Sequence, residues 1–229
     1  MNSKSSSVLR SPLFEKIFKR IQTESACVIC ITGASGVGKS TFVTELVKQA
    51  AALYGVESTV ISSDHFLRKE LRGSISFRNN YDGPLTPAFF DFEAISAAVG
   101  ALLSGNTVTI DGYERGHGWR SSALTLRPSK SVVCEGLFLD SIDAVSMLPC
   151  DTLIKLTAPQ KVIAERKRRR EILGGGKMPS GRRRTTTDVE REIDSTQKAY
   201  ESYAKVAQPN CTTIELQIDE RGDWKPMIL

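Results

Sequence analysis

The sequence predicts an α/β fold in which a parallel sheet carries helices on both faces. Short apolar runs typical of buried strands alternate with longer segments whose apolar residues recur at helical spacing. The 229 residues are 40% hydrophobic and 25% charged, close to the composition of soluble globular chains. The length suits one domain, with or without a mobile subdomain, and the composition excludes a disordered chain or a disulfide scaffold.

The individual elements follow from these patterns and from the turn residues between them. The apolar runs predict strands at 27–32, 56–61, 108–110, 132–135, 152–156 and 212–218. Helical spacing predicts helices at 12–23, 39–54, 93–103, 159–170 and 186–206. We expect the polar, turn-rich stretches 66–90 and 112–121 to be loops.

No apolar run approaches the roughly 20 residues of a membrane-spanning helix, so we expect no membrane segment. The opening residues, MNSKSSSVLRSP, contain no apolar stretch long enough for a secretory signal, and we expect a cytoplasmic protein. Cys27 and Cys30 form a C-x-x-C pair inside an apolar run. We interpret them as buried, reduced strand residues, since no second pair completes a zinc site.

A glycine-rich loop follows the first predicted strand. Residues 33–40 read GASGVGKS and match G-x-x-x-x-G-K-[ST] in full. The glycines let backbone N–H groups point at a phosphate, and the helix that begins at 39 adds the positive end of its dipole. We therefore predict that the loop binds a nucleoside triphosphate. The expected binding residues are Gly33, Ser35, Gly36, Val37, Gly38, Lys39, Ser40 and Thr41.

Within this loop, we expect Lys39 to reach the β- and γ-phosphates and Ser40 to bind Mg²⁺. The chain has no N-K-x-D stretch for reading guanine, so we do not expect a GTPase. A kinase, an ATP-driven machine and a regulatory ATPase stay open at this point.

Two carboxylates are expected at strand ends that line the ligand crevice of an open parallel sheet. Asp64 follows the second strand and could take the proton of an attacking hydroxyl or support Mg²⁺ through water. The alternative for Asp64 is the N-cap of a short helix. Glu135 ends an apolar strand where a carboxylate meets the metal in P-loop enzymes. Asp111 is its rival for that role.

The positive charge is local. Segment 161–184 holds ten basic and two acidic residues, whereas the whole chain has a net charge of only +5. Such a short basic segment suits a compact polyanion at least as well as a nucleic acid, and a solvated helix face is the plain alternative. Arg166 and Arg170 share one helix face, and glycines flank Arg182. This spacing suits a hinged lid whose arginines close over the transferring phosphate.

Five stretches in this order resemble the uridine kinase/phosphoribulokinase family of P-loop kinases, which also includes bacterial pantothenate kinase. They are 33–41 (GASGVGKST), 63–67 (SDHFL), 80–84 (NYDGP) with 90–92 (FDF), 133–136 (VCEG) and 166–171 (RKRRRE). The resemblance implies a P-loop kinase domain over 26–229, with a lid at about 166–187, after an N-terminal segment 1–25 that carries a short helix. It also implies that Asp64 is the catalytic base.

The resemblance also points to acceptor residues. Uridine kinases hold the nucleoside with Y-D-F-x-x-H-x-R, and the nearest match here is Tyr113, His117 and Arg120, without the phenylalanine and with one residue fewer before the histidine. Packing for Tyr113 and a loop hydrogen bond for His117 are the alternatives. The candidate acceptor residues are Tyr81, Asp82, Tyr113, His117, Arg120 and Arg166.

These observations together predict a kinase that uses ATP and Mg²⁺ to phosphorylate a hydroxyl of a small metabolite. The expected catalytic residues are Asp64, Lys39, Arg166 and Arg170, with Arg170 and Arg182 also on ATP and with Ser40, Glu135 and Asp64 on Mg²⁺. A nucleoside is the first acceptor, and pantothenate, a sugar or a sugar acid is the alternative. A nucleic-acid-associated or regulatory ATPase is the alternative of another class. We expect no nucleic-acid partner, and a homo-oligomer stays open.

Overall fold

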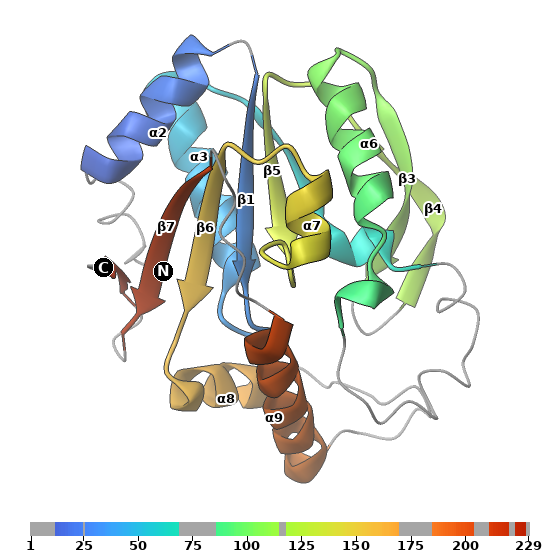
Figure 1. Cartoon of the computed structure of the whole chain (residues 1–229), viewed down its shortest axis with the longest axis vertical. Coiled ribbons are helices and arrows are strands. Elements are labelled where there is room, and N and C mark those ends of the chain that lie inside the picture. The colour runs from blue at the N-terminus through green and yellow to red at the C-terminus, as the bar shows by residue number, and fades with distance from the viewer. Residues whose placement is uncertain are drawn as a thin grey trace.

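The structure is a computed structural model, and it describes residues 12–24, 26–68, 86–114, 118–169, 185–203, 211–219 and 223–227. Within these residues the centre of the molecule is a six-stranded sheet in the order β2-β5-β1-β6-β7-β8 (Figure 1). Its strands are β1 (Cys27–Gly33), β2 (Ser58–Ser62), β5 (Ser131–Gly136), β6 (Thr152–Thr157), β7 (Thr212–Ile218) and β8 (Trp224–Pro226). All neighbours pair in parallel except β7 and β8. The predicted α/β fold with a parallel sheet is confirmed.

Helices cover both faces of this sheet, as Figure 1 shows. They are α2 (Pro12–Thr23), α3 (Lys39–Tyr54), α6 (Phe92–Leu103), α7 (Ile142–Met147), α8 (Gln160–Arg168) and α9 (Thr186–Tyr203), with short 3₁₀ helices η1 (Ser63–Phe66) and η2 (Pro87–Phe89). The central strand β1 is buried along its whole length. Its alternate residues face two separate cores, because successive side chains of a strand point to opposite faces. Ile29 packs with α2 and α3, and Cys30 packs with α6 and α7.

The helix ends have identifiable stop and start signals. Helix α3 ends at Gly55, whose left-handed backbone (φ 64°) lets its N–H bond back to the last turn. Asp91 caps α6 by accepting the N–H of Ala94 at 3.0 Å, and Ser141 caps α7 by accepting that of Ala144 at 3.3 Å. These caps fix where each helix joins the sheet.

The predicted loop at 112–121 is wrong for the described residues 112–114 and 118–121. Strands β3 (Val108–Glu114) and β4 (Gly118–Leu126) pair antiparallel in a hairpin outside the main sheet. Glycines at 112, 116 and 118 suggested a loop, but Gly112 lies within β3 and Gly118 begins β4. The sequence reading also missed α7 and β8, each too short to give a periodic pattern.

Other expectations on this part of the chain can be compared directly. Helix α2 spans the predicted residues and packs into the same core as α3 and β1. Cys27 and Cys30 are buried in β1, as predicted, and all five cysteines are free thiols. Among the described residues, no group of three or more potential ligands could hold a metal ion, and none of the helices is long and apolar enough to cross a bilayer.

Replacing Phe14 by alanine tests whether α2 is integral to the fold. Its ring is fully buried and lies 6.2 Å from that of Phe18 and 6.0 Å from that of Phe42, measured between centroids. Phe14→Ala should lower the free energy of unfolding by about 3–5 kcal/mol, because it leaves a cavity between α2 and α3. Urea denaturation measures this. The exposed Lys16→Ala on the same helix should change it by less than about 0.5 kcal/mol, and equal values for the two variants would contradict the packing.

Candidate active site

The loop between β1 and α3 follows a path that only glycine can take at two positions. Gly36 and Gly38 have φ angles of +89° and +109°, in the left-handed region. A Cβ at Gly36 would lie 2.9 Å from Cγ of Lys167, and one at Gly38 would lie 3.0 Å from Nη1 of Arg166. Helix α8 thus packs directly on the loop, and its basic side chains occupy the space above the glycines.

Two cations bind the carbonyl groups of this loop. Lys39 Nζ donates to the carbonyl oxygens of Gly33 at 2.8 Å and Ala34 at 3.2 Å. The guanidinium of Arg166 donates to the carbonyl oxygen of Val37 at 2.7 Å. Burial beside the loop lowers the pKa of Arg166 from its usual value. These bonds direct the loop carbonyls toward positive charge.

Glu135 lies at the centre of the candidate site. Ser40 Oγ donates to its Oε1 at 3.4 Å. Burial is the largest cause that raises the pKa of Glu135; the charge of Lys39 lowers this pKa and that of Asp64 raises it. Ser62, at the end of β2, lies opposite Glu135 in the β2–β5 register. The carboxyl ends of β1, β2 and β5 therefore bring Lys39, Ser40, Asp64 and Glu135 together, as expected of parallel strands.

The structure also bears on the alternatives for the two acids. Asp64 lies inside η1, and the N-cap residue of that helix is Ser62, which makes no capping side-chain bond. Asp111 lies in β3 opposite Ala123, on the hairpin outside the main sheet. Glu135 is thus the carboxylate next to Ser40. The roles of these residues on phosphate and metal stay predictions.

The structure describes some of the remaining predicted site residues, and the others lie outside the described part of the chain. Ser35 and Val37 lie in the loop, and Thr41 is exposed in the first turn of α3. The backbone N–H of Tyr113 donates to Nδ1 of His65 at 2.8 Å, which joins the hairpin to η1 beside Asp64. Arg120 belongs to β4, and only its backbone is described. Five predicted residues lie outside the described residues: Tyr81, Asp82, His117, Arg170 and Arg182.

Sequence reasoning missed a buried polar cluster next to the loop. Asp140 is 1% exposed and accepts a bond from Thr32 Oγ1 at 3.2 Å and one from the Tyr200 hydroxyl at 3.4 Å. Lys155 Nζ lies 3.7 Å from the same carboxylate. The cluster joins β1 and β6 to α9. Its one sequence signal is an acidic residue at the end of the apolar run 137–139.

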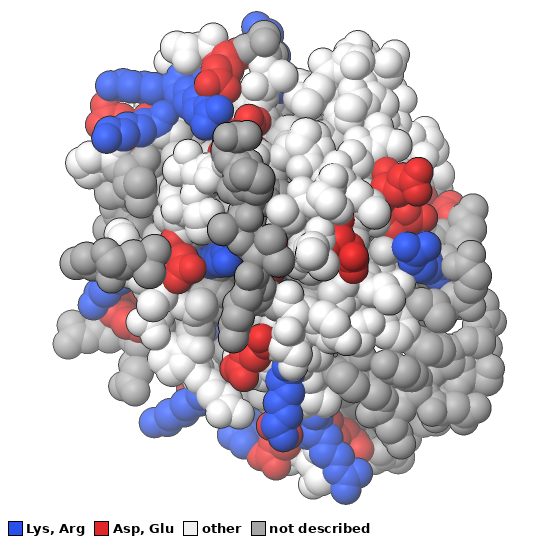
Figure 2. All heavy atoms as spheres, viewed as in Figure 1, with Lys and Arg blue, Asp and Glu red and all other residues white. Residues whose placement is uncertain are grey.

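Charged side chains are unevenly distributed over the surface. On the face seen in Figure 2, those of the described residues lie over α2, over α8 and α9, and in a mostly acidic group at the right of the view. The described part of this face has no broad basic surface of the kind that nucleic-acid binding needs.

Residues 28–219 match the model of the Phosphoribulokinase / Uridine kinase family. The chain belongs to this family. Its members are ATP-dependent kinases of small molecules, and this chain is a kinase of that kind. The resemblance found in the sequence is confirmed.

Solved structures support the same fold. D-glycerate 3-kinase of Cryptococcus neoformans is 11% identical, with a TM-score of 0.65 over 95% of this chain and 100% of that one. A candidate fructose transport system kinase of Silicibacter sp. TM1040 is 21% identical, with a TM-score of 0.65 over 88% of this chain and 96% of that one. The protein YGR205w is 16% identical, also at 0.65, over 97% and 96%. Among curated proteins, none is similar enough in sequence to count as a match.

Glu135→Gln should stabilise the protein at neutral pH. Burial raises the folded-state pKa of Glu135 above its unfolded value, so the folded state loses stability as the pH rises through that raised pKa. Glutamine carries no charge and escapes this penalty. Urea denaturation without nucleotide or metal should show the variant more stable than the parent at pH 7.5, with the difference shrinking toward pH 5.

The exposed Glu57→Gln serves as the control and should show no such pH-dependent difference. A Glu135→Gln protein that is less stable than the parent at pH 7.5 would contradict the electrostatics described for this carboxylate.

Proposed function

We propose that the protein transfers the γ-phosphoryl group of ATP to a hydroxyl group of a small metabolite, with Mg²⁺. The proposal rests on one observation: Lys39, Ser40, Glu135 and Asp64 converge at the carboxyl ends of β1, β2 and β5. Phosphoryl transfer needs a phosphate cradle, a cation site and a base within a few ångströms of one another. The convergence supplies a candidate for each.

The residues present fit a magnesium ion. The Ser40 hydroxyl and the Glu135 carboxylate offer the oxygen ligands that Mg²⁺ prefers, and they already lie 3.4 Å apart. Asp64 is close enough to affect the pKa of Glu135 and would hold a metal-bound water. When bound, Mg²⁺ neutralises charge on the β- and γ-phosphates.

Each of the other residues acts through its charge or its proton affinity. Lys39 would exchange its bonds to the loop carbonyls for the phosphate oxygens. Asp64 would accept the proton of the attacking hydroxyl. Arg166, which already lies against the loop, would stabilise the charge of the transferring group, together with the predicted lid residues Arg170 and Arg182.

Specific observations favour two acceptor classes. The hairpin that carries Tyr113 is joined to η1 through His65, next to Asp64, and this bond supports a role for the hairpin in contacting an acceptor. In the first class, a nucleoside would contact this hairpin and the candidate residues Tyr81, Asp82, His117, Arg120 and Arg166.

The second class is a sugar or sugar acid, and we consider it the better supported of the two. The hairpin sequence departs from the nucleoside-holding pattern at the phenylalanine and in its spacing. Solved structures with a TM-score of 0.65 include a D-glycerate 3-kinase and a candidate fructose transport system kinase. These observations support an acceptor smaller than a nucleoside.

Asp64→Asn should reduce kcat by about 10²–10⁴-fold while leaving the affinity for ATP largely unchanged, because only the proton acceptor is lost. Steady-state kinetics with the identified acceptor and calorimetric titration with a non-hydrolysable ATP analogue measure the two effects. An unchanged kcat would remove Asp64 from the base role. Asp143→Asn, an exposed aspartate on α7, is the matched control and should behave as the parent.

Lys39→Ala should differ from Asp64→Asn because it should weaken ATP binding as well as turnover. This change removes the cation that we assign to the β- and γ-phosphates, so both ATP affinity and kcat should fall, the latter by orders of magnitude. If Lys39→Ala kept the parent's affinity for the analogue, the assignment of the loop as the phosphate cradle would be wrong.

The acceptor is identified by measuring ATP consumption with sugars, glycerate and other sugar acids, pantothenate and nucleosides, with the product confirmed by mass. We expect a sugar or sugar acid to gain the 80 Da of a phosphoryl group and nucleosides to react more slowly. Faster nucleoside phosphorylation would favour the first class. ATP hydrolysis stimulated by nucleic acid, with no phosphorylated metabolite, would contradict the proposed function.

A further inference from the structure

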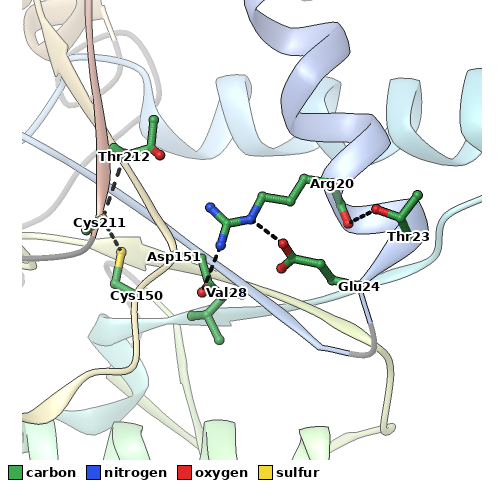
Figure 3. A network of polar contacts seen from close by, with 8 residues as sticks. All are labelled: Arg20, Thr23, Glu24, Val28, Cys150, Asp151, Cys211 and Thr212. Atoms are coloured by element: carbon green, nitrogen blue, oxygen red, sulfur yellow. Dashed lines mark hydrogen bonds and ion pairs between the residues drawn. The ribbon is translucent and has the colours of Figure 1, made fainter.

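Two thiols lie in contact at the sheet edge opposite the candidate active site. The sulfur atoms of Cys150 and Cys211 are 3.5 Å apart (Figure 3). Cys150 lies just before β6 and Cys211 just before β7, and both are partly exposed. The buried Cys30 is also hydrogen-bonded to Cys150. The group thus combines two accessible thiols with a buried one.

Backbone bonds hold the two cysteines beside each other. The N–H of Thr212 donates to the carbonyl oxygen of Asp151 at 3.0 Å, and the N–H of Asp151 donates to that of Val28 at 2.9 Å. The Asp151 carboxylate also accepts the N–H of Val28 at 2.7 Å, and Arg20 lies 3.6 Å from its other oxygen. Residue 151 is therefore fixed to β1, β7 and α2, and Figure 3 shows this network around the thiols.

This placement suits a disulfide. Neighbouring strands lie about 4.8 Å apart, and the Cα atoms of disulfide-linked cysteines are usually about 4.4–6.8 Å apart. The register pairs Thr152 with Thr212, so Cys150 and Cys211 are offset by one residue across neighbouring strand ends, and their sulfurs are already in contact. Side-chain rotation can therefore close the bond, and the strands need not separate or change register.

The surroundings also distinguish the two thiols chemically. Hydrogen bonds from Cys211 and Cys30 lower the pKa of Cys150 below its ordinary value. The same contact and burial raise the pKa of Cys211. Because the thiolate is the attacking form, Cys150 is the one that begins an exchange.

We propose that Cys150 and Cys211 form a reversible intramolecular disulfide on exposure to a small-molecule disulfide such as oxidised glutathione. The Cys150 thiolate attacks one sulfur of the small disulfide and releases one small thiol. Cys211 then loses its proton, attacks the Cys150 sulfur of the mixed disulfide and releases the second small thiol. Two protein thiols are oxidised, and one small disulfide is reduced to two thiols.

The bond would connect the amino ends of β6 and β7. The chain between the two cysteines includes α8 and α9, so the cross-link closes a long loop and restricts the unfolded chain. The loop with Lys39 lies at the other end of the strands. We therefore expect oxidation to raise thermal stability and to leave nucleotide binding unchanged.

The full-length reduced protein is incubated with oxidised glutathione, transferred to denaturant containing iodoacetamide so that every free thiol is alkylated, and analysed by mass spectrometry. Two of the five cysteines should escape alkylation, a peptide linking Cys150 to Cys211 should appear, and dithiothreitol should restore all five. The apparent Tm should rise by about 5–10 °C on oxidation. Absence of a cross-link, a link through Cys30 or a disulfide between two chains would overturn the proposal.

Single variants keep the test independent of kinase activity. Cys150→Ser and Cys211→Ser should each lose both the cross-link and the rise in Tm. Cys27→Ser, in the neighbouring strand β1, should retain both. A stable cross-link in Cys211→Ser would show that another pair of cysteines forms the bond and would overturn the assignment.

Discussion

Close contact between the glycine-rich loop and its neighbours is the constraint on which the rest of the site depends. A Cβ at Gly33 would overlap the carbonyl oxygen of Leu156 in β6, and the spaces above Gly36 and Gly38 are filled by side chains of α8. A larger residue at Gly33 would press on the backbone of β6, and one at Gly36 would press on the stem of Lys167. At Gly38 the guanidinium could move aside, and the left-handed backbone is what favours glycine there. A phosphate ligand adds a second reason for the same residues.

The contact with α8 also sets the electrostatics of the site. Lys167 is 1% exposed, and its aliphatic stem packs against Gly36, which holds the neighbouring Arg166 against the loop carbonyl of Val37. On the other side, the charges of Asp64 and Lys39 act on Glu135 in opposite directions. The loop thus lies between a basic helix and an acidic pair. A divalent cation beside Glu135 would reduce the repulsion between the two acids and complete this arrangement.

Sequence reasoning succeeded where the controlling contacts are local or follow from a regular sheet. Lys39 and Ser40 belong to one motif, and Asp64 and Glu135 could be placed because parallel strands end at one edge. It failed where tertiary packing decides. Nothing near Lys167 in the sequence distinguishes it from the basic residues around it, because its burial depends on a glycine more than a hundred residues away. A strand was predicted at 108–110, but the rest of the β3–β4 hairpin was missed because cross-strand pairing leaves no local trace in the sequence.

The two ends of the parallel strands carry different chemistry. The glycine-rich loop follows the carboxyl end of β1, and the two thiols lie near the amino ends of β6 and β7. The seven residues of β1, at a rise of about 3.3 Å per residue, separate the Cys150–Cys211 pair from the loop by about 20 Å. Every one of them is buried between the two cores, so packed strand residues separate the two sites. Helices α8 and α9 lie between the two cysteines in sequence but beyond the other ends of the strands in space (Figure 1). We therefore expect a cross-link there to act mainly on the unfolded chain and to leave the geometry around Glu135 unchanged.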